Sequence, residues 1–172
     1  MNALRFRPEE PDDETSIFAL TKAAFDGRHY ASGNEAEIID ALRASGALTL
    51  SLVALRDNDI VAHIAFSPVT IDDEPSQWLG LGPVSVFPAQ QGKGIGQALI
   101  RHSLDEVKGN GVQGVVLLGN PEYYRRFGFA AASDLHMQGY PPEYLMSLHL
   151  AGPMPKGGVL FHPAFHDTPR SD

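Results

Sequence analysis

The chain contains no cysteine among its 172 residues. This absence excludes disulfides and a cysteine nucleophile, and cysteine usage therefore gives no indication of the cellular compartment. Basic residues are also few, with 13 Lys and Arg against 21 Asp and Glu, for a formal net charge of −8. A general affinity for nucleic acid needs a basic face, so we expect no nucleic-acid partner.

Long apolar runs are missing as well. No segment approaches the roughly 18 consecutive apolar residues that a membrane span needs. The first residues, 1–7, lack the apolar core of a signal peptide. We therefore expect no membrane partner and a cytoplasmic location. Hydrophobic residues make up 43% of the chain and charged residues 20%, which is typical of a globular protein. The length fits one domain, which we place at 1–166, with a loose C-terminal tail at 167–172.

Hydrophobic periodicity and turn residues predict the elements. Asp12 or Asp13 is expected to cap the first helix through its side chain. The apolar segment at Val115 predicts a central strand that is covered on both faces. The sum is an α/β chain with a mixed sheet and helices on both sides. We expect strands at 3–7, 48–55, 60–71, 77–86 and around 115–118, and helices at 12–25, 34–45 and 94–108.

The segment from Val84 to Ile100 is the most informative part of the sequence. An apolar strand ends before Pro88, a glycine-rich loop follows, and an amphipathic helix begins near Gly94. The N-terminus of a helix carries unpaired N–H groups and the positive end of the backbone dipole, which favours bound phosphate. Glycines let a phosphate approach those amides closely. The loop therefore predicts a phosphorylated ligand, and the alternative is an ordinary strand-to-helix turn.

The spacing of the glycines selects among the known phosphate loops. Gly92, Gly94 and Gly96 recur at every second residue, which fits neither the Walker A loop nor the dinucleotide fingerprint. Gln91-x-x-Gly94-x-Gly96 instead resembles the Gln/Arg-x-x-Gly-x-Gly/Ala loop of the GCN5-related N-acetyltransferase (GNAT) superfamily. In that superfamily the loop binds the pyrophosphate of coenzyme A.

A second block of sequence carries the same resemblance. The pattern Tyr-x-x-x-Gly-Phe from Tyr124 to Phe129 is similar to the other hallmark of these enzymes, and it follows at the expected separation. Three further segments, at 81–86, 119–124 and 159–165, resemble the YhbS-like subgroup of predicted acetyltransferases. The resemblance implies the GNAT fold, a central and mostly antiparallel sheet whose parallel fourth and fifth strands splay apart, flanked by helices.

The resemblance also implies the residues that bind acetyl-CoA, the co-substrate. In the family the pantetheine arm lies between the splayed strands, which here end near Val86 and Leu118, and pairs with exposed backbone groups. Lys93 would add a positive charge beside the diphosphate, or it is a solvated loop lysine. Asn120 would bond to the pantetheine arm, or it is a turn residue before a proline. The implied ligand-binding residues are Val84, Ser85, Val86, Gln91, Gly92, Lys93, Gly94, Ile95, Gly96, Gln97, Asn120 and Tyr123.

Acetyl transfer to an amine needs a neutral nucleophile, a stabilised oxyanion and a proton for the leaving thiolate. Tyr124 matches the family's tyrosine general acid, and a phenol with a pKa near ~10 can protonate a departing sulfur. A backbone N–H near Val86 is the expected oxyanion donor. Two alternatives remain: Tyr124 is a core aromatic residue, or its neighbour Tyr123 faces the ligand. Without cysteine, direct attack is simpler than a relay through an acyl-enzyme, although a serine relay stays open.

The general base is not evident, because the segment from Gln77 to Val86 lacks the glutamate that many relatives carry there. Glu35, Glu37, His63 or a chain of ordered waters could accept the proton. The other histidines show no metal-ligand spacing, so we expect no metal. These histidines are His29, His102, His136, His149, His162 and His166.

The sequence thus predicts an acetyltransferase that moves an acetyl group from acetyl-CoA to a primary amine of a small molecule or peptide. Two other functions remain open, a non-catalytic acyl-CoA-binding module of the same fold and an interaction protein without a nucleotide ligand. The acceptor pocket is expected between the loops Gly27–Gly33 and Gln138–Leu150. A homodimer is an open expectation, since superfamily members often pair through their sheets.

Overall fold

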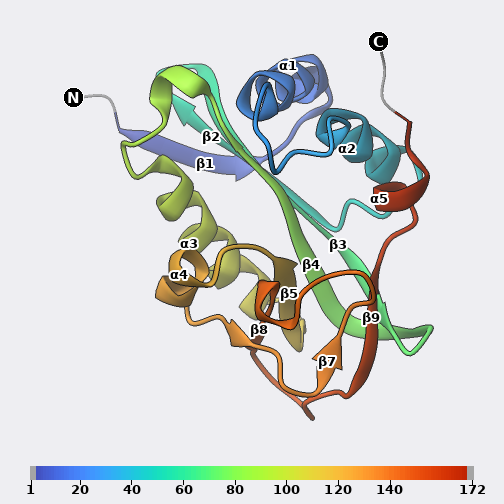
Figure 1. The fold of residues 1–172 in the computed structure, drawn as a ribbon. Helices are drawn as coiled ribbons and strands as arrows, with labels where there is room; N and C mark the ends of the chain where they lie inside the picture. The colour runs from blue at the N-terminus through green and yellow to red at the C-terminus, as the bar shows by residue number, and fades with distance from the viewer. Residues whose placement is uncertain (1–2, 170–172) are drawn as a thin grey trace.

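The structure is a computed structural model that describes residues 3–169. One sheet dominates it, with the strand order β1-β2-β3-β4-β5-β8-β6, and β9 adds to β3 and β7 (Figure 1). The strands are β1 Leu4–Pro8, β2 Leu50–Arg56, β3 Asp59–Ile71, β4 Glu74–Val86, β5 Gly114–Leu118, β6 Ala130–Ala131, β7 Leu135–His136, β8 Leu145–His149 and β9 Gly157–Phe161.

Five α-helices and four short 3-10 turns connect these strands within the described residues. The helices are α1 Glu14–Phe25, α2 Glu35–Ala44, α3 Ile95–Lys108, α4 Pro121–Tyr124 and α5 Ala164–Asp167. The predicted start of the tail at 167 coincides with the last residue of α5, and residues 170–172 lie outside the described part of the chain. No helix between residues 3 and 169 is long and apolar enough to cross a membrane.

The sheet is antiparallel except where β4 and β5 run parallel in the main sheet and β7 and β9 pair beside it. The expected mixed sheet with parallel fourth and fifth strands is therefore confirmed. β5 lies between β4 and β8, and Val115, Val116 and Leu117 are buried, as the apolar segment predicted. Two-sided burial explains why this strand is apolar throughout rather than alternating.

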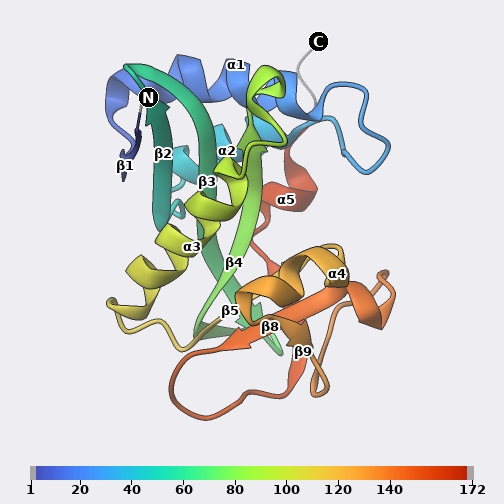
Figure 2. The same ribbon diagram turned by 90° about the vertical axis from the view of Figure 1, so that its left-hand side faces the viewer.

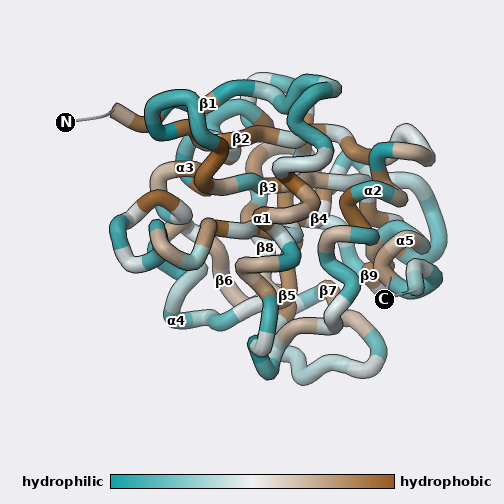
Figure 3. The backbone as a smooth tube through the Cα atoms, turned by 90° about the horizontal axis from the view of Figure 1, so that it is seen from above, coloured by the Kyte–Doolittle hydropathy of each residue, from teal (hydrophilic) through white to brown (hydrophobic). Residues whose placement is uncertain are grey.

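The side chains of β2 alternate between two hydrophobic clusters, one on each face of the sheet. Leu52 and Ala54 belong to the cluster that contains Leu99 of α3, whereas Val53 and Leu55 pack with residues of α1 and α2. Successive side chains of a strand point to opposite faces, so a run of apolar residues is needed where both faces are covered. In Figure 2, α3 crosses the near face of the strands and α2 lies behind them. The hydropathy colouring in Figure 3 shows that many of the outer loops are hydrophilic.

The first helix has Asp13 at its N-cap position but lacks the expected side-chain cap. A 3-10 turn, Pro11–Asp13, precedes α1, and Asp13 makes no side-chain capping bond to that helix. Its carboxylate instead accepts bonds from the guanidinium of Arg7, at 2.6 Å, and from the backbone N–H of Glu10, at 2.7 Å. A charged partner on β1 competed successfully with the helix terminus, because hydrogen bonds between charged groups are the stronger kind.

Candidate active site

The glycine-rich loop joins β4 to α3 and leaves the start of that helix open. Gly92 and Gly94 have φ angles of 79° and 80°, which side chains disfavour, and nothing lies within 4 Å of a Cβ built on either. Gly94 is the N-cap and offers no side chain to the helix amides. The first intrahelical bond runs from the N–H of Ala98 to the carbonyl of Gly94, at 3.1 Å. The N–H groups of the preceding turn therefore have no partner within the helix, as an anion site requires.

Gln91 contributes to this loop through its side chain. Its backbone N–H already donates to the carbonyl of Pro88, at 3.3 Å. The side-chain nitrogen donates to the carbonyl of Val86, at 2.9 Å, and the side-chain oxygen accepts from Arg28, at 3.0 Å. Gln91 thus ties the loop to the end of β4 and to the segment after α1. The exposed Lys93 contacts Gln90, with its ammonium 3.5 Å from the amide oxygen.

β4 and β5 separate at the same end of the sheet. Their parallel pairing covers only Trp78–Gly80 against Gly114–Val116. Beyond it, β4 stays paired with β3, and its register shifts where Ile64 and Phe66 oppose Val84 and Leu81. An extra residue of this kind bends the strand that carries it.

The backbone of β4 faces the gap at alternate residues. The N–H of Phe87 donates to the carbonyl of Val61 on β3, at 2.8 Å. Because the N–H and C=O groups of a strand alternate in direction, Ser85 also faces β3 while Val84 and Val86 face the side that β5 has left. The Ser85 side chain is buried, with its hydroxyl 3.5 Å from that of Thr21 on α1. Val84 therefore presents its N–H and C=O groups to the gap, whereas Val86 presents its N–H, since its carbonyl already accepts from Gln91.

A cavity of about 980 Å³ occupies this gap. Its walls come from both splayed strands, from the segment after α1 and from α4 with the turn before β8. The lining residues are Phe25, His29, Tyr30, Leu81, Gly82, Val84, Leu118, Gly119, Asn120, Tyr123, Tyr124 and Tyr144.

The adjacent tyrosines of α4, Tyr123 and Tyr124, point toward different parts of the site. Their rings are perpendicular, with centroids 5.0 Å apart. The hydroxyl of Tyr123 points toward the start of α3, since a Cβ built on Gly96 would lie 3.7 Å from it. The ring of Tyr124 instead covers Gly119, where an added Cβ would lie 2.5 Å from its Cε2 atom. The structure therefore places Tyr123 toward the glycine loop and Tyr124 over the end of β5.

The environment keeps both phenols protonated. Burial raises the pKa of Tyr124 to about 12, with further contributions from Tyr123 and Tyr30. Burial also raises the pKa of Tyr123, against the guanidinium of Arg126 that stacks 4.6 Å from its ring centroid. A phenol of this kind keeps its proton at neutral pH and can direct it in a hydrogen bond at a thiolate formed beside it, although the raised pKa makes it a weaker acid than an ordinary phenol.

Asn120 lines the cavity and also holds α4 in place. Its side-chain oxygen accepts from the N–H of Glu122, at 2.9 Å, which makes it the N-cap of the helix. The structural role that the sequence offered as an alternative is therefore present. The amide nitrogen is the end of this side chain that can donate to a ligand.

None of the three residues that the sequence offered as a general base lines the cavity. Glu35 accepts from the backbone N–H groups of Ser32 and Gly33, at 2.8 and 3.1 Å, and Glu37 forms an ion pair with Lys22 on α1. His63 is fully buried on β3. These contacts give each residue a structural role.

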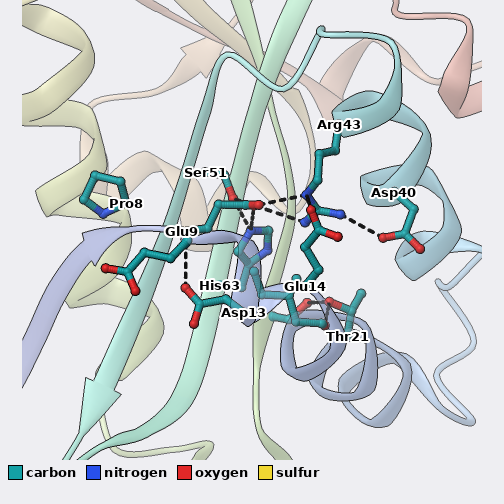
Figure 4. A network of polar contacts seen from close by, with 12 residues as sticks. Pro8, Glu9, Asp13, Glu14, Thr21, Asp40, Arg43, Ser51 and His63 are labelled. Atoms are coloured by element: carbon teal, nitrogen blue, oxygen red, sulfur yellow. Dashed lines mark hydrogen bonds and ion pairs between the residues drawn. The ribbon is translucent and has the colours of Figure 1, made fainter.

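Figure 4 shows the polar network that contains His63. Arg43 of α2 donates to both oxygens of Glu9, at 2.8 and 3.1 Å, and the hydroxyl of Ser51 donates to the same carboxylate. Because that hydroxyl is used as a donor, it accepts from Nε2 of His63, 2.7 Å away. Burial lowers the pKa of His63 to about 4, so the ring is neutral and carries its proton on Nε2. The network fastens α2 and the end of β1 to the sheet.

The structure also adds residues that sequence analysis did not single out for the site. His29 and Tyr30 come from one predicted acceptor loop and Tyr144 from the other, while Phe25 ends α1. The first expected loop joins α1 to α2, but the second, Gln138–Leu150, is a loop only in part, because it contains β8, which pairs with β5. Neither carries a sequence pattern that marks a binding site. No group of three or more potential metal ligands gathers anywhere in residues 3–169.

Comparison with known proteins decides the family. Residues 5–132 match the family described as acetyltransferase (GNAT) domain. The chain is 35% identical to the uncharacterized N-acetyltransferase YhbS of Escherichia coli over 164 residues, which cover 94% of this chain and 95% of that protein. The chain belongs to the GNAT acetyltransferase family. The resemblance stated from the glycine loop and the Tyr124 block is thereby confirmed.

Solved structures of GNAT acetyltransferases agree with this assignment. A GNAT acetyltransferase from Brucella melitensis, solved in complex with acetyl-CoA, is 47% identical, with a TM-score of 0.86 over 96% of this chain and 99% of that one. Escherichia coli YhbS in complex with CoA is 33% identical, with a TM-score of 0.87 over 96% of this chain and 93% of that one. The predicted fold and enzyme class are therefore correct.

Proposed function

We propose that this acetyltransferase binds acetyl-CoA with its diphosphate on the glycine loop and its pantetheine arm in the gap between β4 and β5. The open N–H groups at the start of α3 support the first contact. The main-chain groups of Val84 and Val86 that face away from β3 support the second, because an extended arm can add to that edge like a strand. Relatives solved with acetyl-CoA and with CoA support the choice of ligand.

In this proposal the diphosphate rests on the amides from Gly92 to Gln97, and Gln91 holds the loop in place. Lys93 is exposed beside the loop and adds a positive charge to the anion site. The Asn120 amide nitrogen donates to the pantetheine arm, and the Tyr123 hydroxyl lies at the junction of the arm and the loop.

The reaction is a direct attack on the thioester. The lone pair of a neutral primary amine forms the new C–N bond, and the carbonyl oxygen becomes an oxyanion that the N–H of Val86 stabilises. The C–S bond then breaks and the thiolate takes the proton of the Tyr124 hydroxyl. The amine loses its extra proton to water, since no carboxylate lines the cavity, and solvent restores the proton of Tyr124.

The position and protonation of Tyr124 are the observation that carries this mechanism. Its ring covers the end of β5 within the cavity, and its pKa of about 12 means that the hydroxyl carries its proton at neutral pH. The test is Tyr124→Phe, which keeps the ring and removes the proton. Release of free thiol should fall by about 10²- to 10⁴-fold in kcat, as expected for loss of a general acid.

The neighbouring tyrosine provides the matched control. Tyr123→Phe removes an equivalent hydroxyl from the same helix and should lower kcat less than about tenfold. The Kd for CoA should change little in Tyr124→Phe, which separates chemistry from binding. Full activity in Tyr124→Phe, or a larger loss in Tyr123→Phe, would assign the proton to another group.

A further inference from the structure

One end of the cavity is lined by aromatic side chains. We call this the aromatic end and define it as Phe25, His29, Tyr30, Tyr124 and Tyr144. The rings of Phe25 and His29 both meet that of Tyr30 edge to face, with centroids 6.2 and 5.5 Å apart. The remaining lining residues belong to the splayed strands, to the segment after β5 and to Tyr123.

The aromatic end includes the proposed proton donor, Tyr124. The Tyr30 hydroxyl is close enough to contribute to the raised pKa of Tyr124. Tyr144 lies beside the end of β5, because its carbonyl accepts from the N–H of Gly119, at 3.0 Å. A molecule that occupies this end would therefore lie next to the reacting thioester of the proposed function.

Two of these aromatic residues are poorly covered by the protein itself. Tyr30 is 66% exposed and Tyr144 is 45% exposed. Large aromatic surface left open at the mouth of a cavity is typical of a binding site rather than of a core. Beyond the edge-to-face contacts of Tyr30 with Phe25 and His29, much of the surface of these two residues stays open to a ligand.

Charge restricts the ligand further. The chain carries a net charge of −8, yet no Asp or Glu is among the residues that line this cavity. A second ammonium group drawn into it would lose its water without meeting a carboxylate, which is costly. A polyamine or another multiply charged amine therefore fits the cavity poorly, although its charge suits the protein as a whole.

We propose that the acceptor is a primary amine on a short arm attached to a flat aromatic body, with no second positive charge. This inference rests on the proposed acetyl transfer and names the class of acceptor. The aromatic body stacks among the rings of Tyr30 and Tyr144, and the amine extends past Tyr124 toward the thioester.

The test compares amines of graded chemistry as acceptors in the thiol-release assay with acetyl-CoA. The probes are 2-phenylethylamine, hexylamine, spermidine and a lysine-containing peptide. We expect kcat/KM for 2-phenylethylamine to exceed those of the other three by about tenfold or more. A preference for spermidine, for the peptide or for hexylamine would overturn the inference and leave the acetyl transfer standing. Thiol release with none of the amines, despite bound CoA, would overturn both.

Variants of Tyr30 test whether its ring causes the preference for an aromatic amine. Tyr30→Ala should raise KM for 2-phenylethylamine about tenfold and change that for hexylamine much less, whereas Tyr30→Phe should keep the parent value. Tyr140, which is 50% exposed and not among the lining residues, supplies the control, and Tyr140→Ala should behave like the parent. An equal loss for both amines in Tyr30→Ala, with CoA binding unchanged, would refute stacking on this ring.

Discussion

Acidification should destabilise this protein through His63, the histidine buried under α1 and α2. Its pKa is lowered to about 4 by burial, with Arg43 acting in the same direction and Glu9 opposing. In the unfolded chain the same group titrates near its ordinary value of 6.5. The neutral ring therefore contributes stability that is fully present above the unfolded pKa and is lost as the pH falls from 6.5 toward 4.

The size of the effect follows from the two pKa values. At about pH 5 the unfolded chain binds the proton almost fully and the folded protein hardly at all, so the free energy of unfolding falls by about 2 kcal/mol relative to about pH 7.5. Near pH 4 and below, the loss approaches about 3 kcal/mol. Burial of Glu9 alone would raise its pKa, but the hydrogen bonds from Arg43 and Ser51 outweigh it and leave that pKa below 4.5. Its contribution is lost mainly at still lower pH.

Urea unfolding followed by tryptophan fluorescence measures this loss directly, because Trp78 is the single tryptophan and is buried. His63→Gln keeps a donor at the position of Nε2 and cannot titrate, so its stability should vary much less between about pH 7.5 and about pH 5. His136→Gln, at an exposed position, should keep the slope of the parent. A parent protein that loses less than about 0.5 kcal/mol over this range, or an unchanged slope in His63→Gln, would refute the reasoning.

Three further substitutions test the site. Gly119→Ala places a Cβ 2.5 Å from the Tyr124 ring, so kcat in the thiol-release assay should fall at least about tenfold while CoA still binds. Gly94→Ala forces a side chain into a φ of 80°, which should cost about 1 kcal/mol of stability in urea unfolding and raise the Kd for CoA in calorimetry. Gln91→Ala removes the side-chain bond to Val86, and calorimetry should show a Kd for CoA raised by about fivefold, whereas an unchanged Kd would exclude this role.

The sequence predicted the parts of the fold that depend on local chemistry. The glycines and Pro88 located the loop before α3, and the apolar run at Val115 identified a central strand. The helix from Ile95 to Lys108 ends at the residue where the sequence predicted its end. These features depend on backbone conformation and periodicity, which a short segment specifies by itself.

Contacts between distant segments could not be predicted from the sequence. Glu9, Arg43, Ser51 and His63 come from four different parts of the chain, and residue type alone does not tell which polar groups meet. For the same reason His63 was a candidate base until its burial was known. Asp13 illustrates the opposite error, because a plausible local cap was displaced by Arg7 on a neighbouring strand.

The candidate site likewise depends on contacts between distant segments of the chain. The two segments expected to form the acceptor pocket carry no recognisable signature, and Tyr30 and Tyr144 are more than a hundred positions apart in the sequence. Only the packing of α1 and of the turn before β8 around the splayed strands brings them to one cavity. The orientation of Tyr123 and Tyr124 depends in turn on how α4 sits on Gly119, which no local pattern encodes.

A crystal structure of the protein with acetyl-CoA tests the central proposal most directly. We expect the diphosphate within about 3 Å of the backbone nitrogens between Gly92 and Gln97, and the acetyl-bearing sulfur beside the Tyr124 hydroxyl. A cofactor bound elsewhere, or a sulfur out of reach of Tyr124 with the diphosphate in place, would contradict the account.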